Sequence, residues 1–266
     1  MPYKSILVPV DPPLAPANHV HCAAEIARQF DAQLIGLAAE PSPSTDPTGL
    51  SEWDVKAAFE NSRRARFSHS EQEFTRLAGA RPTLWRTSVS DLTGAILTHG
   101  RRADLVVLPA QNAPSGLPLD QGKILSSIGA PVLLIAPQIE EVRARYIVVA
   151  WKDTKEARRA VKDSLPFLLA AKEVLICGVS EGNESAEREA LSDVKDRLKA
   201  HGIKAYGEHV PAAERPSSML LQVARQSAAG LVVAGAFGRT RLNEFVFGGF
   251  TRDLLSQTQV SVLFSH

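Results

Sequence analysis

A glycine pattern near the C-terminus is the feature of this sequence best suited to bind an anion. Gly235 and Gly238 directly follow the apolar run 231–234, which predicts a buried strand. Gly248 comes after nine more residues, just before a segment, 251–255, that predicts a helix. Glycine lets the backbone approach a ligand closely, and a helix N-terminus favours negative charge. The pattern predicts a phosphate-binding loop, with two ordinary turns as the structural alternative.

Three arginines lie close to this loop and could balance phosphate charge. They are Arg239, Arg241 and Arg252, of which Arg239 is the best placed. An arginine near a helix end is also commonly a solvated residue, so each has this second interpretation.

Length and composition favour a two-domain protein of ordinary globular type. The 266 residues are 44% hydrophobic, and the net charge of +1 gives no reason to expect nucleic acid or an anionic membrane as partner. Cys22 and Cys177 are isolated, without a CxxC motif, which fits a reducing compartment. No apolar run is long enough to span a membrane, and segment 1–11 has too short an apolar core for a signal peptide. We therefore expect a cytoplasmic protein.

The chain repeats itself once, which predicts two domains of the same fold. Three pairs of segments match, at offsets of 141, 126 and 130 residues: 6–11 with 147–152, 103–110 with 229–236, and 131–135 with 261–265.

The changing offsets locate the differences between the halves. The first half is 15 residues longer before its fourth strand, and we place this excess in the proline- and serine-rich loop Pro41–Gly49. The second half is four residues longer at its glycine loop. The corresponding stretch 111–120 lacks the glycine spacing and carries Pro114 and Pro118, which have no N–H to donate. We therefore expect nucleotide to bind only in the second half.

Strand and helix patterns alternate along the second half, which predicts an α/β fold. Short β-branched runs suit strands buried on both faces of a parallel sheet, and βα alternation implies a doubly wound layer structure. The predicted strands are 147–151, 173–179, 205–210, 231–234 and 260–264, and the predicted helices are 154–169, 185–201 and 216–227.

We expect two tandem doubly wound domains, 1–140 and 141–266. Each would contain a mostly parallel five-stranded sheet flanked by helices. The domains would be joined near residues 138–144, with their edge strands or flanking helices in contact but without one continuous ten-stranded sheet.

Several other residues have both a structural and a functional interpretation. Asp11, at the end of the first strand, could bind a ribose or cap the following helix. Trp151 could stack on a base or pack in the core. His19 and His21 point to different faces of a helix, so no metal site is expected. No Ser-His-Asp order or G-x-S-x-G motif is present.

The sequence resembles a tandem universal stress protein over essentially its whole length. Nucleotide-binding members of that family carry G-x2-G-x9-G followed by Ser or Thr, after the fourth strand of a five-stranded domain with the adenine nucleotide alpha hydrolase-like fold. Gly235, Gly238 and Gly248 match this motif, whereas Gly249 replaces the hydroxyl residue and Thr251 follows two places later. The family's first strand ends in an aspartate that meets the adenosine. Asp11 matches it in the first half, but Lys152 stands there in the second.

The resemblance implies a stress-response regulatory protein that binds ATP or a related adenine nucleotide, with or without Mg²⁺, in its C-terminal domain. The triphosphate would lie along Gly235–Gly238 and Gly248–Thr251, a segment that includes Phe250. The adenosine would lie near Ala150, Trp151 and Val179. We expect no committed catalysis, although slow ATP hydrolysis or self-phosphorylation is compatible with the sequence. The chain is also expected to form a homodimer.

Two alternatives belong to other functional classes. One is a nucleotide-independent interaction or dimerisation protein of the same fold, which Gly249 and Lys152 favour. The other is an ATP pyrophosphatase or adenylating ligase. Those enzymes use a Ser-Gly-Gly-type loop or a His-x-Gly-His motif, and neither is present.

Overall fold

The computed structural model describes residues 2–10, 18–42, 52–79, 82–111, 117–179, 184–210, 216–236, 249–257 and 259–266. Within these residues, the first half contains the strands β1 Ser5–Pro9, β2 Gln33–Ala39, β3 Thr83–Ser88, β4 Leu105–Pro109 and β5 Val132–Ile135. Its helices are α1 Asn18–Phe30, α2 Glu52–Ala78, α3 Leu92–His99 and α4 Gln121–Ser127, with a short 3-10 turn at Gly100–Arg102.

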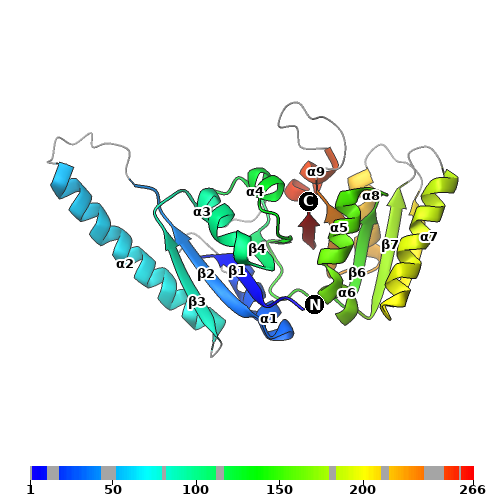
Figure 1. Cartoon of the computed structure of the whole chain (residues 1–266), viewed down its shortest axis with the longest axis horizontal. Helices are drawn as coiled ribbons and strands as arrows, with labels where there is room; N and C mark the ends of the chain where they lie inside the picture. Colours follow the sequence, from blue (N-terminus) through cyan, green and yellow to red (C-terminus); the bar gives the residue numbers. More distant parts are fainter. Residues whose placement is uncertain are drawn as a thin grey trace.

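The second half repeats this order. Its strands are β6 Tyr146–Trp151, β7 Glu173–Val179, β8 Ala205–Val210, β9 Leu231–Gly235 and β10 Ser261–Ser265. Its helices are α5 Lys155–Asp163, α6 Leu165–Ala170, α7 Glu184–Ala200, α8 Pro216–Gln226 and α9 Gly249–Gln257. The predicted α/β class, with parallel strands and flanking helices in each half, is confirmed (Figure 1).

The strands of both halves form one continuous sheet, in the order β3-β2-β1-β4-β5-β10-β9-β6-β7-β8. Pairing is parallel within each half, and the halves join through the antiparallel pair β5–β10, where Val262 faces Leu134 and Phe264 faces Val132. The expectation that no ten-stranded sheet would form is therefore wrong. All residues of β5 and β10 are buried, and an unpaired edge would leave their backbone groups without partners.

Helices cover both faces of the sheet, and each face has its own apolar core. Side chains of α1, α2, α5, α6 and α7 pack in one core cluster, and those of α3, α4, α8 and α9 pack in the other. Both clusters include residues of the two halves. The halves therefore share their cores as well as their sheet.

The helix predicted over 154–169 is two helices, which corrects the sequence-based expectation. Helix α5 ends at Asp163 and α6 begins at Leu165, with Ser164 between them and Pro166 in the first turn of α6. Proline has no N–H and its ring clashes with the carbonyl four residues earlier, so within a helix it kinks or breaks the helix, whereas the first turn tolerates it.

The extra length of the first half lies partly in helix α2, not only in the predicted loop. Helix α2 has 27 residues, whereas its counterpart α7 has 17. Pro41 and Ser42 are in neither a helix nor a strand, and the rest of the predicted loop lies outside the described residues. Figure 1 shows α2 reaching beyond the sheet at the outer side of the first half.

Aromatic side chains join the halves where their helices meet. Tyr3 and Phe30 of the first half lie with ring centroids 5.6 and 5.1 Å from that of Phe167 in α6. The Tyr3 hydroxyl also donates to the backbone carbonyl of Asp163 across 2.7 Å. These contacts fix α5 and α6 against the first half.

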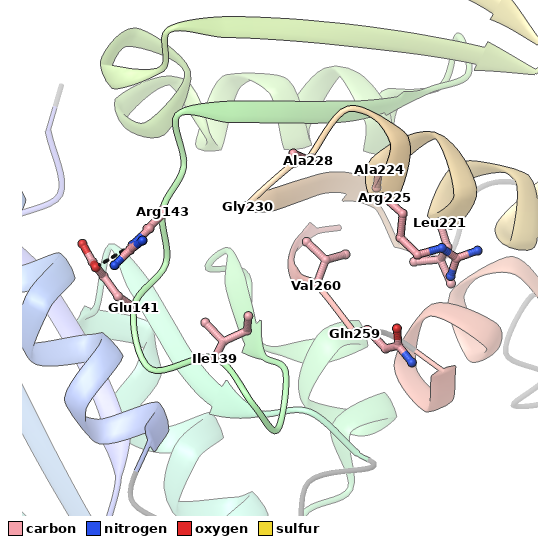
Figure 2. A pocket seen from close by; sticks show the side chains of 11 residues that line it. Ile139, Glu141, Arg143, Leu221, Ala224, Arg225, Ala228, Gly230, Gln259 and Val260 are labelled. Carbon is pink, nitrogen blue, oxygen red and sulfur yellow. Dashed lines mark hydrogen bonds and ion pairs between the residues drawn. The ribbon is translucent and has the colours of Figure 1, made fainter.

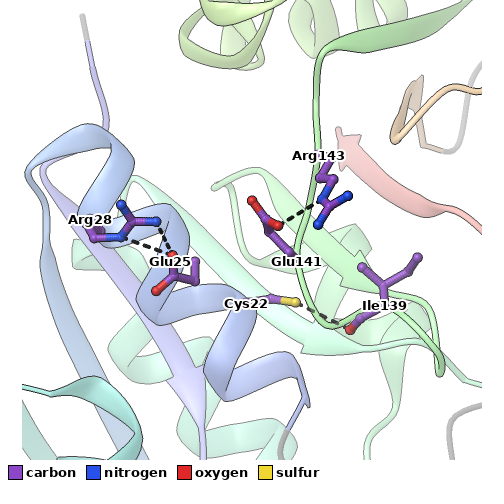
Figure 3. Close-up of polar contacts among 6 residues, drawn as sticks. All are labelled: Cys22, Glu25, Arg28, Ile139, Glu141 and Arg143. Atoms are coloured by element: carbon purple, nitrogen blue, oxygen red, sulfur yellow. Dashed lines mark hydrogen bonds and ion pairs between the residues drawn. The ribbon is translucent and has the colours of Figure 1, made fainter.

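The segment that connects the halves is held against helix α1. The Asn18 side-chain amide donates to the carbonyls of Ala136, Pro137 and Ile139 at 3.1–3.2 Å. The Cys22 thiol donates to the Ile139 carbonyl across 3.5 Å (Figure 3). A connection fixed in this way is not a free linker.

Candidate functional site

Among the described strands of the second half, the winding direction reverses between β6 and β9. Helix α5, which follows β6, packs on one face of the sheet, and α9, which follows β9, packs on the other. Ligands of doubly wound proteins bind in the crevice at such a point, at the carboxyl ends of the strands. Gly235 ends β9 there and Gly249 begins α9. The sequence-predicted residues Gly238, Arg239 and Gly248 lie outside the described residues, as do Arg241 and Asp11.

Gly235 lies directly against the first turn of α5. A Cβ atom at this position would be 2.7 Å from the backbone nitrogen of Ala157 and 2.7 Å from the carbonyl carbon of Glu156. A side chain would therefore force the strand and helix apart. Glycine is needed here for backbone packing, a role that is independent of any ligand.

The first turn of α9 contains the next three predicted residues. Gly249 is exposed, and a Cβ there would have no atom of the described residues within 4 Å. Phe250 is half-buried and packs on the apolar core, while Thr251 is 3% exposed. Of the three, Gly249 is the exposed residue, at a helix N-terminus whose free N–H groups can meet an anion.

The residues predicted to surround the adenosine lie at the ends of neighbouring strands. Ala150 and Trp151 end β6, and Val179 ends β7. Trp151 is 7% exposed and belongs to the core cluster on the α5 face. Because apolar side chains surround the indole, its position favours core packing over stacking on a base.

The sequence analysis missed Glu156, a buried acid beside the first glycine of the motif. Its side chain is 3% exposed, and its Cβ is 3.0 Å from the position of a Cβ on Gly235. Oε1 lies 3.5 Å from the Lys155 ammonium, whereas Oε2 has no hydrogen-bond partner among the described residues. An acidic residue in the turn after a strand is common in sequences, so nothing in the pattern marked this one.

The corresponding region of the first half is occupied by the protein's own side chains. The offset that relates β5 to β10 pairs Gln121 with Thr251. The burial pattern supports this pairing, because Ile124 and Leu125 of α4 are as deeply buried as Leu254 and Leu255 of α9. Gln121 donates its amide to the carbonyl of Pro109, the last residue of β4, across 2.7 Å.

His19 hydrogen-bonds the end of the neighbouring strand, β1, in the same half. Its Nε2 lies 3.0 Å from the carbonyl oxygen of Pro9, at the end of β1. The ring is 1% exposed, and burial lowers the pKa of His19 to about 4. The imidazole is therefore neutral at pH 7, and its Nε2–H donates to this carbonyl. His21, two residues on, is exposed, as its position on the other helix face requires.

Neither cysteine offers a reactive thiolate. Both are free and buried, and burial raises the pKa of Cys22 to about 12 and that of Cys177 to about 11. In the part of the chain that the structure describes, no three His, Cys, Asp or Glu residues are grouped so as to hold a metal ion.

Two cavities formed by described residues lie away from the predicted site. One, of about 310 Å³, lies between the connecting segment and the amino ends of β9 and β10, where Arg143, Arg225, Gly230 and Val260 contribute to its walls (Figure 2). The other, of about 350 Å³, is lined by Arg158, Arg159, Lys162, Asp163 and Arg197. Neither includes a residue predicted from the sequence.

The fold is a tandem pair of doubly wound α/β domains joined at their edge strands. Residues 143–266 match the model of the universal stress protein family. The second half of the chain thus belongs to that family, and the resemblance drawn from its sequence is confirmed. A comparison with curated proteins found no match.

Solved structures with the same tandem arrangement extend the likeness to both halves. A universal stress protein from Archaeoglobus fulgidus DSM 4304 is 14% identical, with 98% of this chain and 97% of that chain covered and a TM-score of 0.74. A functionally unknown protein from Pseudomonas aeruginosa PAO1 is 18% identical, with 99% and 92% covered and a TM-score of 0.65. A proposed universal stress protein from Pseudomonas aeruginosa UCBPP-PA14 is also 18% identical, with 99% and 93% covered and a TM-score of 0.64. At these identities the likeness shows the shared fold.

Among the helices of the described residues, none is long and apolar enough to cross a membrane.

Proposed function

We propose that this chain is a stress-response regulatory protein that binds ATP or a related adenine nucleotide in its C-terminal domain. The observation that carries the proposal is the position of the glycine motif. Its first glycine, Gly235, ends β9 at the point where the winding reverses, and Gly249 opens α9 with exposed backbone. An anion placed there would meet the N–H groups and the positive end of the helix dipole.

The residues present fit a nucleotide at this point. A Cβ on Gly249 would meet no atom within 4 Å among the residues that the structure describes. Arg252 is exposed on the same helix turn and offers a positive charge. Bound Mg²⁺ would share the charge of the outer phosphates. Ala150 and Val179, at the neighbouring strand ends, would lie nearest the adenosine.

Regulation without committed catalysis is part of the same proposal. Both thiols are buried, and the Ser217 hydroxyl, which donates to the Asp253 carboxylate of α9 across 2.6 Å, is buried as well. Binding would act by favouring one conformation or one association state, which requires a ligand affinity that differs between the two states. We place this activity in the cytoplasm, with homodimer formation as a possible output.

The proposal does not include nucleotide binding by the first half of the chain. Gln121 and His19 already bond the carbonyls that end β4 and β1. The alternative, a nucleotide-independent interaction protein, is favoured by Lys152 at the position of the family's aspartate and by the core position of Trp151.

The decisive experiment is mass spectrometry of small molecules released from the purified full-length protein, with calorimetry for ATP, ADP and AMP. One adenine nucleotide bound per chain supports the proposal. No binding of any of the three at millimolar concentration favours the interaction protein.

A further inference from the structure

Two buried polar groups, one at the end of β6 and one in the first turn of α5, have no hydrogen-bond partner among the described residues. One is Nε1 of Trp151, which donates, and the other is Oε2 of Glu156, which accepts. The two residues are 7% and 3% exposed. A buried polar group without a partner destabilises the fold, and such groups are rare in native proteins. Two of them within six residues of chain therefore need an explanation.

The position of Glu156 relates it to the glycine motif. Its Cβ is 3.0 Å from the position of a Cβ on Gly235, so the carboxylate branches off beside the end of β9. It stands in the first turn of α5, whose N-terminus favours a negative charge. Thr154 caps that turn by accepting from the Ala157 N–H at 3.2 Å, and Glu156 Oε1 has the Lys155 ammonium at 3.5 Å. Oε2 of Glu156 can therefore still accept a hydrogen bond.

We propose that Glu156 recognises the ribose of the nucleotide by accepting a hydrogen bond from its 2′-hydroxyl group. This inference rests on the proposed function and assigns the sugar-binding residue within it. The strand end that precedes α5 is followed by exposed Lys152, a cation that cannot accept a hydrogen bond. Glu156 Oε2 can accept from the 2′-hydroxyl, the group that distinguishes a ribose from a deoxyribose.

The first arm of the test uses only the wild-type full-length chain. Calorimetry compares ATP with 2′-deoxy-ATP, which differs from it by one hydroxyl group. A ribose-binding carboxylate predicts that ATP binds at least tenfold more tightly. Equal affinity for the two nucleotides overturns the assignment while leaving nucleotide binding intact. If neither nucleotide binds, the proposed function itself fails, and the assignment fails with it.

The second arm replaces the carboxylate by an amide of the same shape. Glu156→Gln should lower the affinity for ATP, ADP and AMP by the same factor, about tenfold, and leave that for 2′-deoxy-ATP unchanged. Glu208→Gln, an exposed glutamate on the edge strand β8, is the matched control and should change nothing. If Glu156→Gln weakens ATP and 2′-deoxy-ATP equally, Glu156 has a structural role and the proposal is wrong. Should that variant unfold, Glu156→Asp gives the same comparison, with a weaker preference for ATP expected.

Discussion

The side-chain amide of Gln121 donates to the carbonyl oxygen of Pro109 across 2.7 Å, inside the first domain. Pro109 ends β4 as Gly235 ends β9, and the offset of 130 residues pairs Gln121, which begins α4, with Thr251, the third residue of α9. In the first half, a side chain thus hydrogen-bonds the end of the strand that corresponds to β9.

We predict that Gln121→Ala lowers the free energy of unfolding by about 1–3 kcal/mol, because the buried Pro109 carbonyl loses its donor. Urea denaturation measures the change, and affinity for ATP should stay the same. Gln222→Ala, at an exposed position of α8, is the control. Equal stabilities of the two variants would show that the Gln121 hydrogen bond contributes nothing.

A side chain at either of two glycine positions in the loop should weaken nucleotide binding. Gly238→Val and Gly248→Val are predicted to weaken nucleotide binding at least tenfold, about 1.4 kcal/mol, while the domain stays folded. A side chain would fill the space that the phosphates approach and disfavour positive φ angles. Arg239→Ala should weaken ATP more than AMP, because its charge would act on the outer phosphates. Calorimetry of the three variants tests this.

The control for the loop is Gly116→Val in the first half, which should leave nucleotide affinity unchanged. These four positions lie outside the described residues, so the prediction depends on sequence spacing. Unchanged ATP affinity in both glycine variants would mean that the loop is only a turn.

Stability should fall in mild acid because of His19. Burial lowers its pKa to about 4 in the folded protein, whereas an exposed histidine has a pKa of about 6.5. Between these values the unfolded chain binds more protons, so the stability contribution is complete above pH 6.5 and is lost as the pH falls toward 4. The loss amounts to about 3 kcal/mol.

His19→Gln removes the titrating ring but keeps a donor for the Pro9 carbonyl. Denaturation at a series of pH values should therefore show a flatter dependence between pH 4 and 6.5 in this variant than in the wild type. His21→Gln, at an exposed neighbouring position, should leave the wild-type dependence unchanged. Parallel curves for the wild type and His19→Gln would contradict the assignment.

A single methyl group added at Gly230 should destabilise the packing of the connecting segment. A Cβ on Gly230 would lie 2.0 Å from the carbonyl oxygen of Arg143, so the two backbones would have to separate. Gly230→Ala should lower the free energy of unfolding by about 1–3 kcal/mol and increase protease cleavage near residue 143. In Gly178→Ala the nearest side-chain atoms, from Leu191, would be at 3.7 Å, and stability should change little. Matching protease sensitivity in the two variants would refute the prediction.

Much of the fold could be predicted from local patterns. The strand 173–179 has the bounds that the sequence predicted, because its β-branched run suits a sheet buried on both faces. The strand 205–210 also has its predicted bounds, although it is the edge strand β8 and partly exposed. The sequence repeat predicted two equivalent halves, and in the structure both halves contain the same order of strands. The single helix over 154–169 was predicted wrongly, because the prediction gave more weight to the apolar periodicity of this segment than to Pro166.

The sequence by itself determined the α/β class, the duplication, the family resemblance and the position of the glycine motif after a buried strand. These depend on residue type and spacing along the chain. Only the tertiary structure decided that β5 and β10 pair, that Trp151 lies in the core, and that Gly235 and Glu156 meet. Each of these contacts joins segments far apart in the sequence or depends on which face a side chain takes. They are set by packing between elements, which local spacing does not encode.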